Sequence, residues 1–185
     1  MRVRDTYRRQ LRTAAYDQYG YVTTSTARDL GIPPDELRQL AHRGGLTRLA
    51  YGLYRFDEIP RTGLEQYMEA VLRVGDDAYL THDAVLAVHE LADVNPTRYR
   101  VGTPHRVRRT LPKWIEVIRR DLRTTAKAHF EGIPTSTVEQ AIRDCRPLVM
   151  RERLLAAANE ARRRGLILRR PHELLVAELE QGAEA

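Results

Sequence analysis

The side chains best suited to chemistry stand in residues 34–43, where long polar groups follow an apolar pattern of helical spacing. On the outer side of such a helix, Arg38 could hold guanine with two hydrogen bonds and Gln39 could hold adenine in the same way. His42 and Arg43 lie one turn further along. These four side chains could therefore read bases in the major groove of DNA. An ordinary solvated helix surface is the competing interpretation.

A second set of polar side chains surrounds this segment. Thr24 and Ser25 begin the preceding short helix, where hydroxyl groups can hold a phosphate or simply cap the helix. Arg48 and Tyr51 fall in a following hairpin, where they could contact the DNA backbone or minor groove, although Tyr51 could also be a plain turn residue. The predicted DNA-binding residues are Thr24, Ser25, Arg28, Arg38, Gln39, His42, Arg43, Arg48 and Tyr51.

A winged helix-turn-helix would position these side chains. Apolar spacing, together with glycine and proline residues at the breaks, predicts helices over residues 5–19, 25–30 and 34–43. Two strand candidates, 46–49 and 53–56, follow around a turn at Gly52 and would form the wing. We therefore expect residues 1–60 to form a winged helix-turn-helix DNA-binding domain.

Residues 20–56 also resemble the N-terminal domain of the AbiEi family of antitoxins. The matching features, in order, are Gly20-Tyr21-Val22-Thr23, Ala27, Leu30-Gly31-Ile32, Leu37, Leu40, Arg43-Gly44, Leu46 and Gly52-Leu53-Tyr54. The resemblance implies a transcriptional repressor of its own operon with two partners, double-stranded operator DNA and a nucleotidyltransferase-like toxin. It also implies a role in phage defence, and it supplies no catalytic residue.

The rest of the chain reads as a second domain of helices and short strands, residues 61–185. A linker over 57–63 precedes a helix at 64–74, and Thr81 is expected to cap a helix that reaches Leu91. Ser136 and Glu139 have the spacing of a capping box, which predicts a helix within 133–145. The remaining predictions are strands at 98–103 and 114–118 and helices at 148–164 and 171–179. The expected fold class is α+β.

This second region resembles the same family more loosely, over residues 79–86 and 132–145. The resemblance makes it a C-terminal antitoxin domain that also helps DNA binding. Between these two segments, residues 91–130 hold ten Arg and Lys against three acidic residues. The basic part, 98–127, could contact DNA phosphates or an acidic face of a protein partner, and the sequence favours neither.

Composition removes several other classes of protein. The 185 residues have a net charge of +6, and 42% are hydrophobic, which is typical of a folded domain. A single cysteine, Cys145, allows neither an internal disulfide nor a cysteine-based zinc site, and a small core residue is its favoured role. No apolar run is long enough for a membrane span and no secretory signal is visible. We therefore expect a cytoplasmic protein that does not associate with a membrane.

Enzyme motifs are not found. His82 and His89 are seven residues apart, whereas a helical metal pair prefers four, so packing or capping is the favoured role of both. We expect no catalytic residue, no metal and no cofactor. The leading hypothesis is an antitoxin. The alternatives are a winged-helix regulator without a toxin, a nuclease-like DNA-binding protein, and a module that binds only other proteins.

Overall fold

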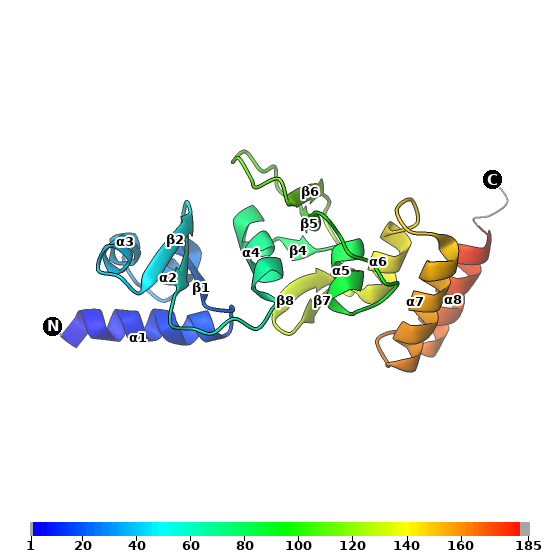
Figure 1. Cartoon of the computed structure of the whole chain (residues 1–185), viewed down its shortest axis with the longest axis horizontal. Coiled ribbons are helices and arrows are strands. Elements are labelled where there is room, and N and C mark those ends of the chain that lie inside the picture. Colours follow the sequence, from blue (N-terminus) through cyan, green and yellow to red (C-terminus); the bar gives the residue numbers. More distant parts are fainter. Residues whose placement is uncertain (1, 182–185) are drawn as a thin grey trace. The chain divides into compact units, whose positions relative to one another are not determined.

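The computed structural model describes residues 2–181, and it divides into two compact units, Met1–Asp76 and Asp77–Ala185 (Figure 1). Both units mix helices with a small sheet, as expected for an α+β protein. The predicted domain boundary followed residue 60, whereas the compact units divide sixteen residues later. The difference is α4 (Glu65–Val74), which belongs to the first unit.

The first unit has the order of a winged helix-turn-helix. Its elements are α1 (Arg2–Tyr16), β1 (Tyr21–Thr23), α2 (Thr24–Asp29), α3 (Pro34–His42), β2 (Leu46–Ala50), β3 (Leu53–Phe56) and α4. The sheet is antiparallel with the order β1-β3-β2, so β3 lies in the middle. One hydrophobic cluster joins the helices of the first unit to its sheet. The members of this cluster with no exposed surface include Leu11, Val22, Leu37 and Phe56.

Two polar contacts attach α4 to the sheet of the first unit. The hydroxyl of Tyr21 donates to Glu69 at 3.1 Å, and the guanidinium of Arg73 donates to the backbone oxygen of Leu49 at 3.1 Å. Arg73 also forms an ion pair with Glu69, with 2.6 Å between Nε and Oε1. These contacts explain why the first unit extends beyond the predicted linker.

The second unit is built on a five-stranded mixed sheet. Its elements are β4 (Tyr79–Leu80), α5 (Asp83–Val88), β5 (Tyr99–Thr103), β6 (Ile115–Arg119), η1 (Thr124–Ala126), β7 (Lys127–Phe130), β8 (Ile133–Ser136), α6 (Val138–Asp144), α7 (Arg151–Arg163) and α8 (Arg169–Gln181). The strand order is β6-β5-β4-β8-β7, so β6 and β7 are the edges. The pairs β4–β8 and β5–β6 are parallel, and the other two pairs are antiparallel.

Two predictions about helix starts in the second unit are wrong. Residues 133–136 form β8, and Ser136 is a buried strand residue instead of a helix cap. The helix begins one residue later, where Thr137 Oγ1 accepts from the backbone N–H of Gln140 at 3.2 Å. Thr81 is not a cap either, because its hydroxyl is buried and donates to Asp144 at 3.4 Å. Both residues are used by the sheet, which the local sequence did not indicate.

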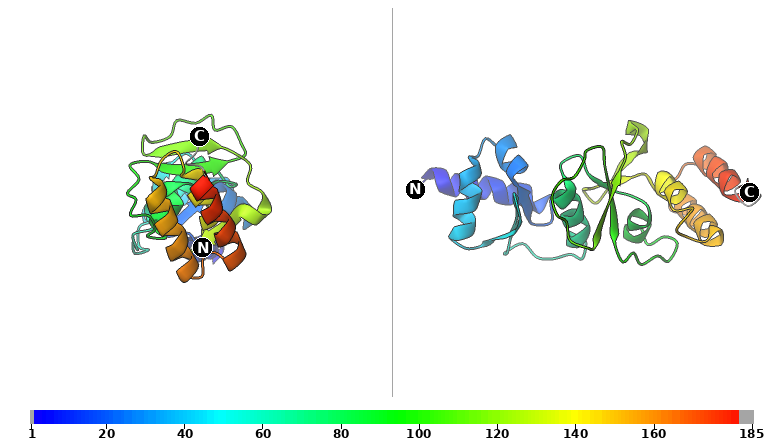
Figure 2. Two further views of the ribbon diagram at one scale, coloured as in Figure 1. Left: turned by 90° about the vertical axis from the view of Figure 1, so that its right-hand side faces the viewer. Right: turned by 90° about the horizontal axis from the view of Figure 1, so that it is seen from above.

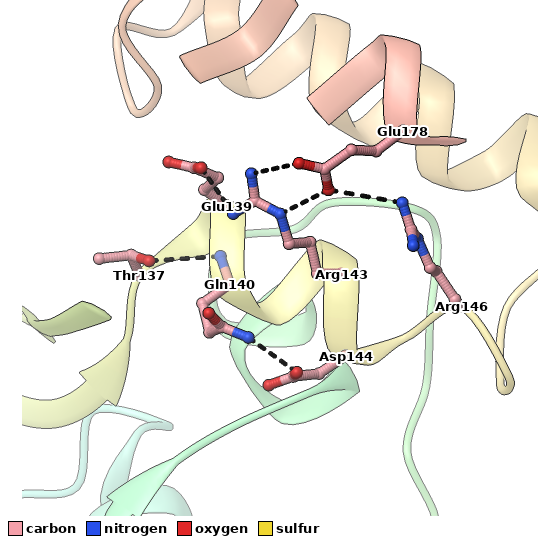
Figure 3. A network of polar contacts seen from close by, with 7 residues as sticks. All are labelled: Thr137, Glu139, Gln140, Arg143, Asp144, Arg146 and Glu178. Carbon is pink, nitrogen blue, oxygen red and sulfur yellow. Dashed lines mark hydrogen bonds and ion pairs between the residues drawn. The ribbon is translucent and has the colours of Figure 1, made fainter. Parts of the chain in front are cut away.

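The last two helices lie side by side (Figure 2) and are joined to α6 by a charge network. Arg143 on α6 contacts Glu178 on α8, with 2.7 Å between Nε and Oε2, and contacts Glu139 at 2.6 Å (Figure 3). Arg146 adds a longer contact to Glu178, at 3.5 Å. The hydrogen bond from Arg143 lowers the pKa of Glu178. This network fixes α8 against α6.

Candidate nucleic-acid interface

The first turn of α2 is held by the residue before it. Thr23 Oγ1 accepts from the backbone N–H of Thr26 at 3.0 Å, and the Thr26 hydroxyl faces back toward the Thr23 backbone, which completes a capping box. The cap is therefore Thr23, and the expectation of a cap at Thr24 or Ser25 is wrong. Both of these residues are half-buried in the first turn, and Arg28 is exposed in the last turn.

The wing tip meets the start of α2. The backbone N–H of Thr24 donates to the Gly52 oxygen at 2.9 Å. Gly52 has φ +72°, and a Cβ at this position would lie 2.9 Å from Thr24 Oγ1, so both backbone shape and space favour glycine. The neighbouring Tyr51 is 86% exposed at the tip. Arg48 is exposed on β2, where its Nε donates to the Ala50 oxygen at 3.3 Å.

The third helix turns one side to the core and the other to solvent. Leu37 and Leu40 are buried, whereas the Arg38 side chain is 75% exposed. Arg38 is 3.0 Å from Asp35, an exposed pair that contributes little stability and can open at low cost. The side chain of Gln39 is half-buried and accepts from the guanidinium of Arg43 at 3.2 Å.

The nine predicted residues thus fall on three neighbouring elements. The α3 helix packs against both α2 and β2, and the wing turn is bonded to the start of α2. Their exposure separates them into two groups. The exposed group consists of Arg28, Arg38, His42, Arg43, Arg48 and Tyr51, and the half-buried group consists of Thr24, Ser25 and Gln39. The exposed group presents four arginines, one histidine and one tyrosine, which suits a polyanion.

Some arginines of the first unit have structural roles that the sequence analysis did not anticipate. Arg55 is buried on β3, and its guanidinium donates to the backbone oxygens of Phe56 at 3.2 Å and Ile59 at 2.7 Å. Arg8 and Arg12 on α1 both contact Glu58, at 3.0 and 3.3 Å. These contacts hold the segment after the wing in place.

The relay from Tyr21 through Glu69 and Arg73 to Leu49 was also missed. Burial and the neighbouring Glu69 raise the pKa of Tyr21, so its hydroxyl stays protonated and donates. The four-residue spacing of Glu69 and Arg73 indicates their helical pair. The same spacing does not indicate that Arg73 contacts Leu49 in the wing.

Two side chains that the sequence analysis considered for chemistry, Cys145 and His89, are packed inside the second unit. Cys145 has no exposed surface, and burial raises its pKa to about 12, which confirms the predicted core role. His89 packs edge-on against Phe130, with 4.6 Å between ring centres, and burial together with Arg164 lowers its pKa to about 4. Across residues 2–181, no group of three or more His, Cys, Asp or Glu side chains is placed to hold a metal ion.

The comparison with known families agrees with the geometry of the first unit. Residues 9–56 match a family described as transcriptional regulator, AbiEi antitoxin. The matched residues run from α1 to the end of β3, so they include α2, α3 and the wing and stop before α4. No curated protein matches the chain. In the part of the chain that is described, no helix is both long enough and apolar enough to span a bilayer.

Proposed function

We propose that the protein binds operator DNA and represses its own operon, because residues 9–56 match a family described as transcriptional regulator, AbiEi antitoxin. The α3 helix would enter the major groove. Its side chains Arg38, Gln39, His42 and Arg43 would face base edges, and the wing would lie over the adjacent backbone or minor groove through Arg48 and Tyr51. Thr24, Ser25 and Arg28 would contact phosphates from α2.

The exposure of α3 carries this proposal. A recognition helix must bury its inner side in its own domain and leave the outer side open, and Leu37 and Arg38 meet these two conditions on adjacent positions. The Arg38–Asp35 pair supports the same view, because a surface ion pair worth about 0–1 kcal/mol is readily exchanged for a guanine contact.

We further propose that the protein is the antitoxin of a bacterial toxin–antitoxin system and counteracts a nucleotidyltransferase-like toxin in the cytoplasm. The family match at residues 9–56 supports an antitoxin role. The toxin partner and the role in phage defence rest on the sequence resemblance alone. Residues 61–185 are the proposed antitoxin domain, because segments 79–86 and 132–145 resemble the same family outside the match at residues 9–56.

Binding of the full chain to duplex DNA from upstream of its own gene tests the DNA-binding proposal. We expect a specific gel shift whose affinity falls steeply between low and physiological salt, because bound phosphates release counterions. An unrelated duplex of equal length is the control. Equal affinity for both duplexes, or an affinity that ignores salt, would count against operator recognition.

Co-expression tests the antitoxin proposal separately. A nucleotidyltransferase-like protein encoded beside this gene should arrest growth, and this chain should restore it. A truncated chain is avoided, so that both units are present. Failure to restore growth, with the gel shift intact, would leave a winged-helix regulator without antitoxin activity.

A further inference from the structure

A cavity of about 380 Å³ lies between the edge strand β6 and the connection that joins it to β5. This connection projects from the sheet (Figure 1). Ile115, Val117 and Arg119 alternate along β6 and therefore share the face that lines the cavity. The intervening Glu116 turns to the other face, where it pairs with Arg100 at 3.3 Å. The connection contributes the other lining residues, His105, Arg106, Val107, Arg109 and Leu111.

The charged part of this lining is entirely basic. Three arginines and one histidine line the cavity, and no acidic side chain is among its lining residues. Within residues 2–181, neither Arg106 nor Arg119 forms an ion pair, so both guanidiniums are available to a ligand. His105 lies 3.0 Å from Asp77, which does not line the cavity. The cavity therefore favours an anion.

The other half of the lining is apolar, and this narrows the kind of anion. Val107, Leu111, Ile115 and Val117 would stay uncovered by an inorganic phosphate or by the phosphate backbone of duplex DNA. The volume falls in the range of about 300–1,000 Å³ that small-molecule sites occupy. An organic anion that carries an apolar group would use both halves.

We propose that this cavity, the β6 groove, binds a small phosphate ester that carries an apolar group. The apolar group would lie on Ile115 and Val117, and the phosphate would accept hydrogen bonds from Arg106 and Arg119. This site belongs to the second unit and is independent of operator binding by the first. It gives a defined role to part of the basic segment 98–127, for which the sequence left two alternatives.

Three probes separate the two halves of the groove. Phenyl phosphate carries both groups, inorganic phosphate only the anion, and phenol only the apolar ring. Each is titrated into the ¹⁵N-labelled full chain, and amide shifts of residues 105–119 are followed together with the fluorescence of Trp114, the single tryptophan and the neighbour of Ile115. Phenyl phosphate should saturate these signals at a concentration roughly tenfold or more below either partial probe.

Charge reversal locates the binding. Arg119→Glu and Arg106→Glu should each weaken phenyl phosphate roughly tenfold or more, since each removes a charged hydrogen bond and adds a like charge. Arg170→Glu is the matched control, because Arg170 is exposed on α8, far along the chain from the groove, and forms no ion pair within the described residues. Equal saturation by phosphate and phenyl phosphate would overturn the proposal in favour of a plain anion patch. Shifts that avoid residues 105–119, or that survive both reversals, would overturn it too.

Discussion

Replacing Arg73 by alanine should loosen the wing without removing any side chain proposed to contact DNA. Arg73 on α4 donates to the Leu49 oxygen of β2 at 3.1 Å and pairs with Glu69 at 2.6 Å. Its side chain is only 16% exposed, so water screens these contacts weakly. The substitution leaves the Leu49 carbonyl without this donor and removes the ion pair of Glu69, which keeps its hydrogen bond from Tyr21.

The size of the effect follows from the charge of the donor. A hydrogen bond to a charged group contributes about 1.5–3 kcal/mol, so Arg73→Ala should lower the free energy of unfolding of the first unit by that amount. Arg169→Ala is the matched control. Arg169 also pairs with a glutamate at four-residue spacing, Glu173 at 2.8 Å, but its side chain is 82% exposed. This exposed pair should contribute little to stability, because solvent screens it.

Urea unfolding and amide hydrogen exchange of the full chain measure this difference. Arg73→Ala should lower the unfolding midpoint and speed exchange in residues 46–56, and Arg169→Ala should do neither. Because the two units can unfold separately, exchange in residues 46–56 is the decisive readout. If both variants protect these amides equally well, α4 does not support the wing and the inclusion of α4 in the first unit has no energetic meaning.

Three further predictions concern single positions. Gly165→Ala, at φ +74° with open space around it, should cost only the backbone share of about 1–2 kcal/mol, whereas Gly52→Ala should destabilise the first unit in thermal unfolding by more than that, because its Cβ would also meet Thr24. His89 has a pKa of about 4 when folded and near 6.5 when unfolded, so its contribution to stability should be complete above pH 6.5 and be lost as the pH falls toward 4. In urea titrations across this range, His89→Asn should reduce the loss of stability. Cys145, buried with a pKa of about 12, should react with a thiol reagent only after unfolding, and rapid labelling of the native protein would contradict its core position.

The helix-turn-helix was predictable because its signals are local. Glycines and prolines end each helix within one turn, and apolar spacing shows which side of α3 is buried. The predicted helix 34–43 differs from α3 by one residue, and the predicted strands 46–49 and 53–56 match β2 and β3 within one residue. The predicted helix 5–19 lies three residues too late, because α1 is Arg2–Tyr16. The cap of α2 was misplaced by one or two residues, because four consecutive hydroxyl residues, 23–26, compete for that role.

The second unit was harder to predict because its sheet joins distant segments. Leu80 pairs with Thr135, and this contact decides that residues 133–136 are a strand although Ser136 and Glu139 have capping-box spacing. Tertiary pairing overrides such local preference. The short strands β4 and β7 were missed for the same reason. The ring of Tyr79 covers Gly102, where any Cβ would clash, and this explains a glycine in a central strand.

The candidate DNA-binding residues could be proposed from the sequence, but their partners could not. Helical spacing indicates that Arg38 faces outward, and it also allows the pair with Asp35. By contrast, the sequence gives no sign that Arg55 differs from the surface arginines of the wing. Only the fold shows that it is buried and donates to a backbone oxygen. The contact of Arg73 with the wing depends on how α4 packs against β2. The spacing of residues along one helix does not determine that packing.

Operator binding by Arg38→Ala tests the central claim most directly, namely that α3 reads bases. Arg163→Ala is its matched control, because Arg163 pairs with Glu160 at the same three-residue spacing and its side chain is also 75% exposed. Against a set of operators with every base pair varied in turn, Arg38→Ala should lose about 1–3 kcal/mol of affinity and stop discriminating at one base position. Arg163→Ala should keep both. Unchanged affinity and an unchanged base preference in Arg38→Ala would contradict the claim.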